Sequence, residues 1–188
     1  MKRKITNKSI ELFEEKGFTQ TSIQDIVNEL EVTKGTFYYY YSSKEQLLMD
    51  IHLEYIDELL NKQDEIIRCP NSTNKEKVTN LIAQLIEDIE THGKRGRVFF
   101  REIRHLSDEN IAIVKEKRNQ VRFNIEKVVN KGIESGEFQF DLQADIVSFA
   151  ILSLTNYRYQ WFKPSGRLSA DHLVEIYTNI LYEGISSD

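Results

Sequence analysis

The chain has 188 residues, of which 40% are hydrophobic and 29% charged, and its formal net charge is −5. These proportions are typical of a globular protein with a hydrophobic core, and they exclude a disordered chain. Two Pro and eight Gly are too few for the frequent turns of an all-β sandwich, so we expect an all-α fold. The single Cys, Cys69, excludes an internal disulfide framework and favours the cytoplasm, and no apolar run approaches the roughly 20 residues of a membrane span.

Apolar residues recur at helical spacing along the first half of the chain. A first helix around Ile5–Phe13 is expected to end at Gly17. A second follows a capping box that begins at Thr21 with Gln24 three residues later, and a short third runs from Thr33 to about Tyr39. A long fourth helix begins after Ser42-Ser43, and its pattern breaks at residues 69–74.

The second half predicts five more helices, for about nine in total. We expect them at Val78–Ile89 (ended by His92-Gly93), Arg97–His105, Asp108–Ser135, Asp141–Phe162 and Ala170–Gly184. The helix at Asp141–Phe162 is apolar almost all round, so it must be covered on two sides. We expect a second subunit to provide that cover, with these last two helices forming a four-helix bundle across a two-fold axis.

Residues 21–48 predict two short capped helices with about three residues between them and a third capped helix after them, which is helix-turn-helix spacing. Five consecutive aromatics fall at Phe37 to Tyr41. A core takes side chains three or four apart, so we expect Phe37 and one tyrosine to be buried and the others to point outward. Exposed phenols beside Lys34 suit hydrogen bonds to phosphate, and Gly35 allows a close approach of a sugar-phosphate backbone.

This segment resembles the DNA-binding segment of the TetR family of bacterial transcriptional repressors. The resemblance covers about residues 5–50, and the matching residues are Thr21, Ile26, Val32, Thr33, Lys34, Gly35, Thr36, Phe37, Tyr38, Tyr40, Lys44, Glu45 and Leu47. It implies a homodimer that binds a palindromic double-stranded DNA operator and is released by a small-molecule effector. Residues 1–48 would then bind DNA, and residues 49–188 would bind the effector and dimerise.

The resemblance also implies roles for single residues. Lys34, Gly35, Thr36 and Tyr39 would face the major groove, with Thr33 at the start of their helix. Phosphates would be held by Thr21, Tyr38, Tyr40 and Lys44, by backbone N–H groups at Ser22 and Ser43, and by the basic residues Lys2, Arg3 and Lys4. Glu31 occupies the position of the usual turn glycine; a positive φ there would cost about 1 kcal/mol.

Two segments of the second half suggest an effector site. Residues 94–104 hold five basic groups and one acid, within a block at 94–131 whose net charge is +6. At the end of the apolar helix, residues 156–167 hold Tyr157, Arg158 and Trp161. A charge on an apolar helix needs an anionic partner, so Arg158 is expected to pair with Glu102, with Asp145 or with the anion of a ligand.

Residues 161–169, with the sequence WFKPSGRLS, resemble a segment of a TetR branch that senses acyl-coenzyme A thioesters. Such a ligand is anionic at one end and apolar at the other. The implied ligand-binding residues are Phe99, Phe100, Arg101, Arg104, Asn156, Tyr157, Arg158 and Trp161. The alternatives are a buried aromatic core beside a solvated basic face, or a different hydrophobic ligand in a regulator of efflux or stress genes.

No other chemistry is predicted. His52, His92, His105 and His172 lack metal-ligand spacing, and no nucleophile, phosphate-loop or dinucleotide motif occurs, so we expect neither an enzyme nor a metal or cofactor. The remaining rival is a protein adaptor that uses its helix-turn-helix to bind another protein instead of DNA.

Overall fold

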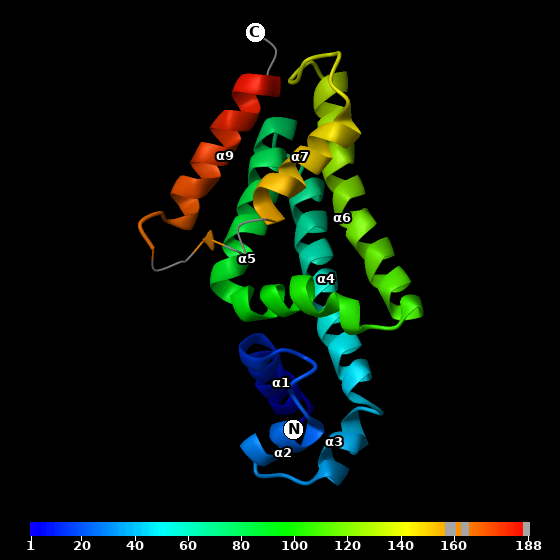
Figure 1. The fold of residues 1–188 in the computed structure, drawn as a ribbon. Helices are drawn as coiled ribbons and strands as arrows, with labels where there is room; N and C mark the ends of the chain where they lie inside the picture. The colour runs from blue at the N-terminus through cyan, green and yellow to red at the C-terminus, as the bar shows by residue number, and fades with distance from the viewer. Residues whose placement is uncertain (157–160, 163–165, 186–188) are drawn as a thin grey trace. The chain divides into compact units, whose positions relative to one another are not determined.

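A computed structural model of the chain describes residues 1–156, 161–162 and 166–185 (Figure 1). This part is built from helices, which confirms the all-α expectation. They are α1 (Lys2–Lys16), α2 (Ile23–Glu29), α3 (Lys34–Tyr40), α4 (Lys44–Arg68), α5 (Asn74–Glu102), the 3-10 helix η1 (Ile103–His105), α6 (Asp108–Glu134), α7 (Ala144–Asn156) and α9 (Ala170–Ile185). None of the described helices is long and apolar enough to cross a membrane.

The chain divides into two compact units, which are described separately. Unit 1 comprises Met1–Asp57 and His92–Glu116, and unit 2 comprises Glu58–Thr91 and Lys117–Asp188. The helices α4, α5 and α6 each contribute residues to both units.

Unit 1 holds the three N-terminal helices, drawn in blue in Figure 1, around a common core. Buried side chains come from each of them: Ile5, Leu12 and Phe13 from α1, Ile26 and Val27 from α2, and Phe37 from α3. Gly17, with a φ of 89°, ends α1 as expected. The capping box of α2 lies one residue later than predicted, because Ser22 is the N-cap and Asp25 is its partner. Thr21 is therefore not the cap, and Gln24 is not the reciprocal side chain.

The expected break near His92-Gly93 is wrong. Helix α5 continues without interruption from Asn74 to Glu102, and only its end and η1 occupy the segment for which a separate helix was expected. A glycine inside a helix costs about 1 kcal/mol relative to alanine, which weakens a long helix without ending it. In the absence of a proline or a positive-φ cap, Gly93 and Gly96 do not stop the helix.

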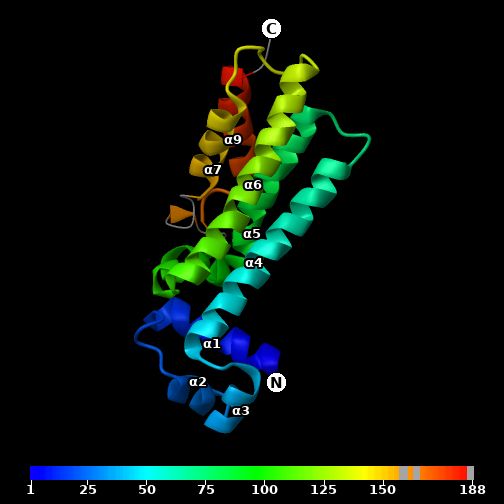
Figure 2. The same cartoon turned by 90° about the vertical axis from the view of Figure 1, so that its right-hand side faces the viewer.

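Unit 2 is a bundle of helices (Figure 2). Side-chain hydrogen bonds join helices of this unit that are distant in sequence. The Tyr182 hydroxyl of α9 donates to the Lys75 carbonyl of α5 and is 2.6 Å from the Thr79 hydroxyl. Glu137 accepts hydrogen bonds from the amides of Asn74 and Lys75, which caps the start of α5. Burial alone would raise the pKa of Glu137, but these hydrogen bonds outweigh it and lower the pKa. The apolar helix predicted at Asp141–Phe162 is described as α7 over Ala144–Asn156.

The turn between α2 and α3 is closed by backbone hydrogen bonds from Glu31 to Asn28 and from Val32 to Val27. Glu31 has a φ of 53° in this turn, which is the left-handed conformation. The position has therefore kept the backbone geometry of the usual turn glycine.

We predict that Glu31→Gly stabilises the protein, because glycine adopts a positive φ without a Cβ clash. The free energy of unfolding should rise by about 1 kcal/mol, measured by urea denaturation. Glu31→Ala, which keeps the Cβ and removes only the carboxylate, is the matched control and should not stabilise. Equal effects of the two variants would show that the backbone at this turn is not strained.

Candidate nucleic-acid interface and effector region

Helix α3 is capped at one end and anchored at the other. Thr33 is its N-cap, and the Thr33 hydroxyl accepts a hydrogen bond of 3.3 Å from the Thr36 amide. Phe37 is completely buried and Tyr41, directly after the helix, is 2% exposed, with their ring centroids 5.7 Å apart. The Tyr41 hydroxyl lies 2.6 Å from the Thr6 hydroxyl of α1. Burial raises the pKa of Tyr41, although the hydrogen bond with Thr6 opposes this.

The other side chains of α3 form an outward surface, which we call the α3 face and define as Lys34, Gly35, Thr36, Tyr38, Tyr39 and Tyr40. Tyr38 is 54% exposed and Tyr39 80% exposed, Lys34 and Gly35 are exposed, and Thr36 and Tyr40 are half-buried. The expectation that Phe37 and one tyrosine are buried while other tyrosines point outward is therefore confirmed. The α3 face combines one cation with hydroxyl donors on a rigid helix, which suits contact with a polyanion.

Two residues expected to contact phosphates have internal hydrogen-bond partners. Thr21 is completely buried, and its hydroxyl donates to the Leu12 and Gly17 carbonyls. The Lys44 ammonium donates to the Phe18 and Thr21 carbonyls at 2.7 and 2.6 Å and lies over the Phe18 ring. Burial lowers the pKa of Lys44, while the charge of Asp25 opposes that shift. Both side chains stabilise the loop between α1 and α2.

The polar groups at Ser22 and Lys2 also have internal partners. The Ser22 amide and hydroxyl both donate to the Asp25 carboxylate at 2.7 Å, so this N–H is not free for a phosphate. These hydrogen bonds lower the pKa of Asp25. Lys2 pairs with Asp50 at 3.1 Å, and the hydrogen bond with Asp50 raises the pKa of Lys2. Arg3 and Lys4, next to it, are exposed.

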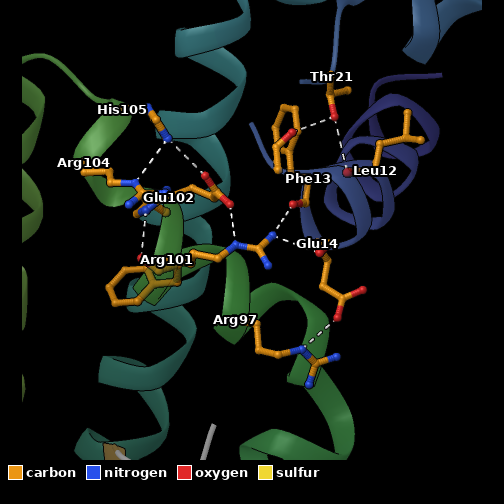
Figure 3. Close-up of polar contacts among 12 residues, drawn as sticks. Leu12, Phe13, Glu14, Thr21, Arg97, Arg101, Glu102, Arg104 and His105 are labelled. Atoms are coloured by element: carbon orange, nitrogen blue, oxygen red, sulfur yellow. Dashed lines mark hydrogen bonds and ion pairs between the residues drawn. The ribbon is translucent and has the colours of Figure 1, made fainter. Parts of the chain in front are cut away.

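Acidic residues of unit 1 neutralise much of the basic segment at 94–104. Arg95 pairs with Glu54 at 3.3 Å, and Arg97 pairs with Glu14 of α1 at 2.9 Å. Figure 3 shows Arg101 between Glu102 and the last turn of α1. Its guanidinium donates to the Glu102 carboxylate and to the carbonyls of Phe13 and Glu14. This arginine joins the end of α5 to the end of α1, and its expected role toward an effector anion stays a prediction.

The neighbours of Arg101 complete this junction. Glu102 is 2% exposed, and its second oxygen is 3.4 Å from His105 Nε2. The His105 ring stacks on Phe18. Arg104 is exposed, and its Nε donates to His105 Nε2 at 3.4 Å (Figure 3).

The remaining residues expected to bind an effector belong to different units. In unit 1, Phe99 is buried against Tyr55 and His52, and Phe100 is half-buried. In unit 2, Asn156 ends α7 half-buried and Trp161 is 45% exposed beside buried Phe162. Tyr157 and Arg158 lie outside the described residues, so the expected partners of Arg158 are not tested. That these two groups form one site stays a prediction.

Sequence reasoning missed His52, which was treated as an isolated histidine. Its ring is completely buried, with Nδ1 2.8 Å from the Leu48 carbonyl and Nε2 3.1 Å from the Phe99 carbonyl. It thereby joins α4 to α5 within unit 1. No local pattern predicts this contact, because its partners are backbone atoms of which one lies 47 residues away. Among the described residues, no group of three or more His, Cys, Asp or Glu side chains is placed to hold a metal ion.

A capped helix-turn-helix with an outward polar face, joined to a larger helical region, is typical of bacterial DNA-binding regulators. Two family profiles match the chain: "Bacterial regulatory proteins, tetR family" over residues 5–51, and "Tetracyclin repressor-like, C-terminal domain" over residues 71–185. The protein belongs to the TetR family of transcriptional regulators.

Known relatives agree with this membership. The HTH-type transcriptional repressor KstR2 of Mycolicibacterium smegmatis is 27% identical over 176 residues, which cover 93% of this chain and 85% of the relative. The solved structure of the ketosteroid transcriptional regulator KstR2 of Mycobacterium tuberculosis has a TM-score of 0.89 at 25% identity, covering 100% of this chain and 95% of that one. The fold is also shared with AibR, solved in complex with isovaleryl coenzyme A and operator DNA, with a TM-score of 0.86 at 21% identity over 96% of this chain and 97% of AibR.

We predict that Arg101→Met lowers the free energy of unfolding by about 2 kcal/mol, because it removes charged hydrogen bonds to α1 and leaves buried Glu102 without its arginine. Arg104→Met, the same change three residues away on an exposed arginine, should have little effect. Urea denaturation measures both. If the two variants were equally stable, the Arg101 junction would contribute nothing to the fold.

Proposed function

We propose that this protein is a homodimeric transcriptional repressor that binds a palindromic operator through α3 and is released by an acyl-coenzyme A thioester. In this proposal, residues 1–48 bind DNA and residues 49–188 bind the effector and dimerise. The observation that carries the proposal is the α3 face, because burial of Phe37 and Tyr41 holds Lys34, Tyr38 and Tyr39 outward on a capped helix. Nothing in this arrangement requires catalysis, and we propose no enzymatic activity.

Within the α3 face, each residue type suits one kind of contact. Lys34, Gly35, Thr36 and Tyr39 would face base edges in the major groove, with Thr33 starting the helix. Tyr38 and Tyr40 would lie against phosphates. Thr21 and Lys44, which the family resemblance assigns to phosphates, bond internal carbonyls and support the loop between α1 and α2.

Exposed apolar side chains support a dimer. Ile146 and Phe149 of α7 are 56% and 53% exposed, although Val147 and Ile151 on the same helix are buried. Ile180 of α9 is 58% exposed. Apolar groups on two helices of one unit are removed from water if a second copy packs on them as a four-helix bundle. A two-fold axis would then present two α3 helices to two half-sites of a palindrome.

The effector class is supported by relatives and by residue chemistry. AibR, which shares the fold, has been solved with isovaleryl coenzyme A and operator DNA. In this chain, exposed Arg104, together with Phe100, Asn156, Trp161 and the undescribed Tyr157 and Arg158, offers cationic and apolar groups for such a ligand. The ligand would release DNA only to the extent that it binds the released state more tightly than the DNA-bound state.

The proposed contacts of the α3 face with DNA can be tested by substitution. Tyr38→Phe should weaken binding to operator and random duplex alike by a few-fold, because it removes one phosphate hydrogen bond. Thr36→Ala should instead reduce the preference for operator over random DNA. Gel-shift titrations measure both, and Tyr182→Phe, which loses a hydroxyl in unit 2, is the matched control.

Salt titration separates this function from that of a protein adaptor. Operator affinity should fall by roughly 0.9 log unit per log unit of salt for each phosphate neutralised. Operator affinity that does not change with salt concentration, together with unchanged affinity of Tyr38→Phe and Thr36→Ala, would refute DNA recognition by α3.

The proposed contact with the effector can be tested by substitution as well. Lauroyl-CoA should release the wild-type protein from operator DNA, and Arg158→Ala should abolish release while leaving operator affinity intact, because the arginine would pair with the ligand anion. Arg167→Ala, on an exposed arginine nearby in sequence, should respond like wild type. Release that persists in Arg158→Ala would contradict the proposed anion contact.

A further inference from the structure

Three amide side chains in the interior of unit 2 connect α4, α5 and α6. Gln63 of α4 is completely buried, and its Oε1 accepts a hydrogen bond of 3.0 Å from Asn124 Nδ2 of α6. Gln84 of α5 is 8% exposed, and its Nε2 donates to the Leu59 carbonyl of α4 at 2.8 Å. Leu59 and Gln63 are one helical turn apart, so both amides lie at the same level of α4.

Each of the two glutamines keeps one buried polar atom without a partner. Gln63 Nε2 and Gln84 Oε1 are inaccessible to solvent and have no hydrogen-bond partner among the described residues. Buried polar atoms in proteins are nearly always paired, so an orphan atom requires an explanation. Here the two orphans are complementary, since one is a donor and the other an acceptor.

The neighbouring hydrogen bonds agree with Gln63 Nε2 as the unpaired atom. Gln120 Nε2 donates to Asn124 Oδ1 at 3.0 Å, and Asn124 in turn donates to Gln63 Oε1. The donors therefore run in one direction, from exposed Gln120 inward, and this order leaves the Gln63 amide protons at the inner end. A helical side chain leans toward the helix N-terminus, so Gln63 extends over the turn that holds Leu59.

The surroundings of these amides are apolar. Buried aliphatic side chains occupy the adjacent turns of the same three helices: Leu59 on α4, Leu81 and Leu85 on α5, and Val121 and Ile125 on α6. A neutral donor and a neutral acceptor amid aliphatic groups do not suit an anion. They suit a neutral group that accepts one hydrogen bond and donates another, carried on an apolar body.

We propose that Gln63 and Gln84 form a polar subsite that binds a neutral hydroxyl or secondary amide of the effector. The inference rests on the proposed function. It adds which chemical group of the effector would be bound inside unit 2. Two sources offer this chemistry: an amide of the pantetheine arm of coenzyme A, and a hydroxyl on the acyl chain. In either source the group accepts from Gln63 Nε2 and donates to Gln84 Oε1.

The test uses the near-isosteric variants Gln63→Met and Gln84→Met, which remove the orphan atoms and keep the side-chain length. Gln143→Met, an exposed glutamine of unit 2, is the matched control. The probes are lauroyl-CoA, β-hydroxylauroyl-CoA and β-hydroxylauric acid, and isothermal titration calorimetry on the full-length protein measures their affinities. Thermal unfolding of the free variants shows whether they fold.

We expect Gln63→Met and Gln84→Met to fold, because loss of the unpaired buried atom offsets loss of the hydrogen bond with Asn124 or with the Leu59 carbonyl. Both variants should bind the probe about tenfold more weakly. If the pantetheine amide is the ligand group, both thioesters lose affinity equally and the free acid binds poorly. If the hydroxyl is the group, only the hydroxylated probes lose affinity.

Unchanged affinity of both variants for all three probes would overturn the proposal, and so would failure of the wild type to bind any of them. A crystal structure of the complex with a water molecule bridging the two glutamines and the probe elsewhere would overturn it as well. Operator binding, measured on the same preparations, distinguishes failure of the subsite from failure of the proposed function. Wild-type release by lauroyl-CoA with unchanged Met variants refutes only the subsite, whereas loss of operator binding by the wild type refutes the proposed function.

Discussion

The burial of Phe37 and Tyr41 is the constraint on which the DNA-binding surface depends. Phe37 lies within α3 and Tyr41 directly follows it, four residues later. Because both side chains are buried in the same core, they fix the rotation of α3 about its axis. Tyr38 and Tyr39 must then point away from the core, which explains how five consecutive aromatics coexist on one short element. A seven-residue helix is too short to be stable alone, so this anchoring also supplies most of the stability of α3.

Several polar side chains in unit 1 support that anchor without facing outward. Thr6 meets the Tyr41 hydroxyl, Thr21 bonds the end of α1, and Lys44 at the start of α4 bonds the loop before α2. Arg101 joins the end of α5 to the same end of α1. Unit 1 is therefore more than three N-terminal helices: Arg101 of α5 bonds carbonyls of α1, and His105 of η1 stacks on Phe18 in the loop after α1.

Local patterns were sufficient to predict most of the helices and the orientation of α3, but not the course of α5. The roles of Gly17, Thr33 and the aromatic run Phe37–Tyr41 follow from residues close to them in sequence. The positive φ at Glu31 was considered only because the family resemblance places a turn glycine there. The error in α5 arose because an isolated glycine weakens a helix without ending it, and long-range packing decides which outcome occurs.

Side-chain roles were harder to predict than helices, because they depend on partners distant in sequence. Lys44 matches a DNA-binding motif but bonds Phe18 and Thr21, and Arg101 lies in a basic segment but bonds carbonyls 87 and 88 residues away. The basic segment at 94–104 is thus weaker evidence for an anion site than its charge alone suggests. Gln63 and Gln84 carry no motif at all, and only the interior of the bundle shows that two of their atoms are unpaired.

The most direct test of the central claim places a cleavage reagent on the α3 face. A Tyr39→Cys variant, made in a Cys69→Ser background so that it carries one thiol, is labelled with an iron chelate and bound to operator DNA. Cleavage is predicted in two clusters about one helical turn apart, or a multiple of that, and symmetric about the centre of the operator. Tight operator binding with cleavage absent or spread evenly along the duplex would contradict the account.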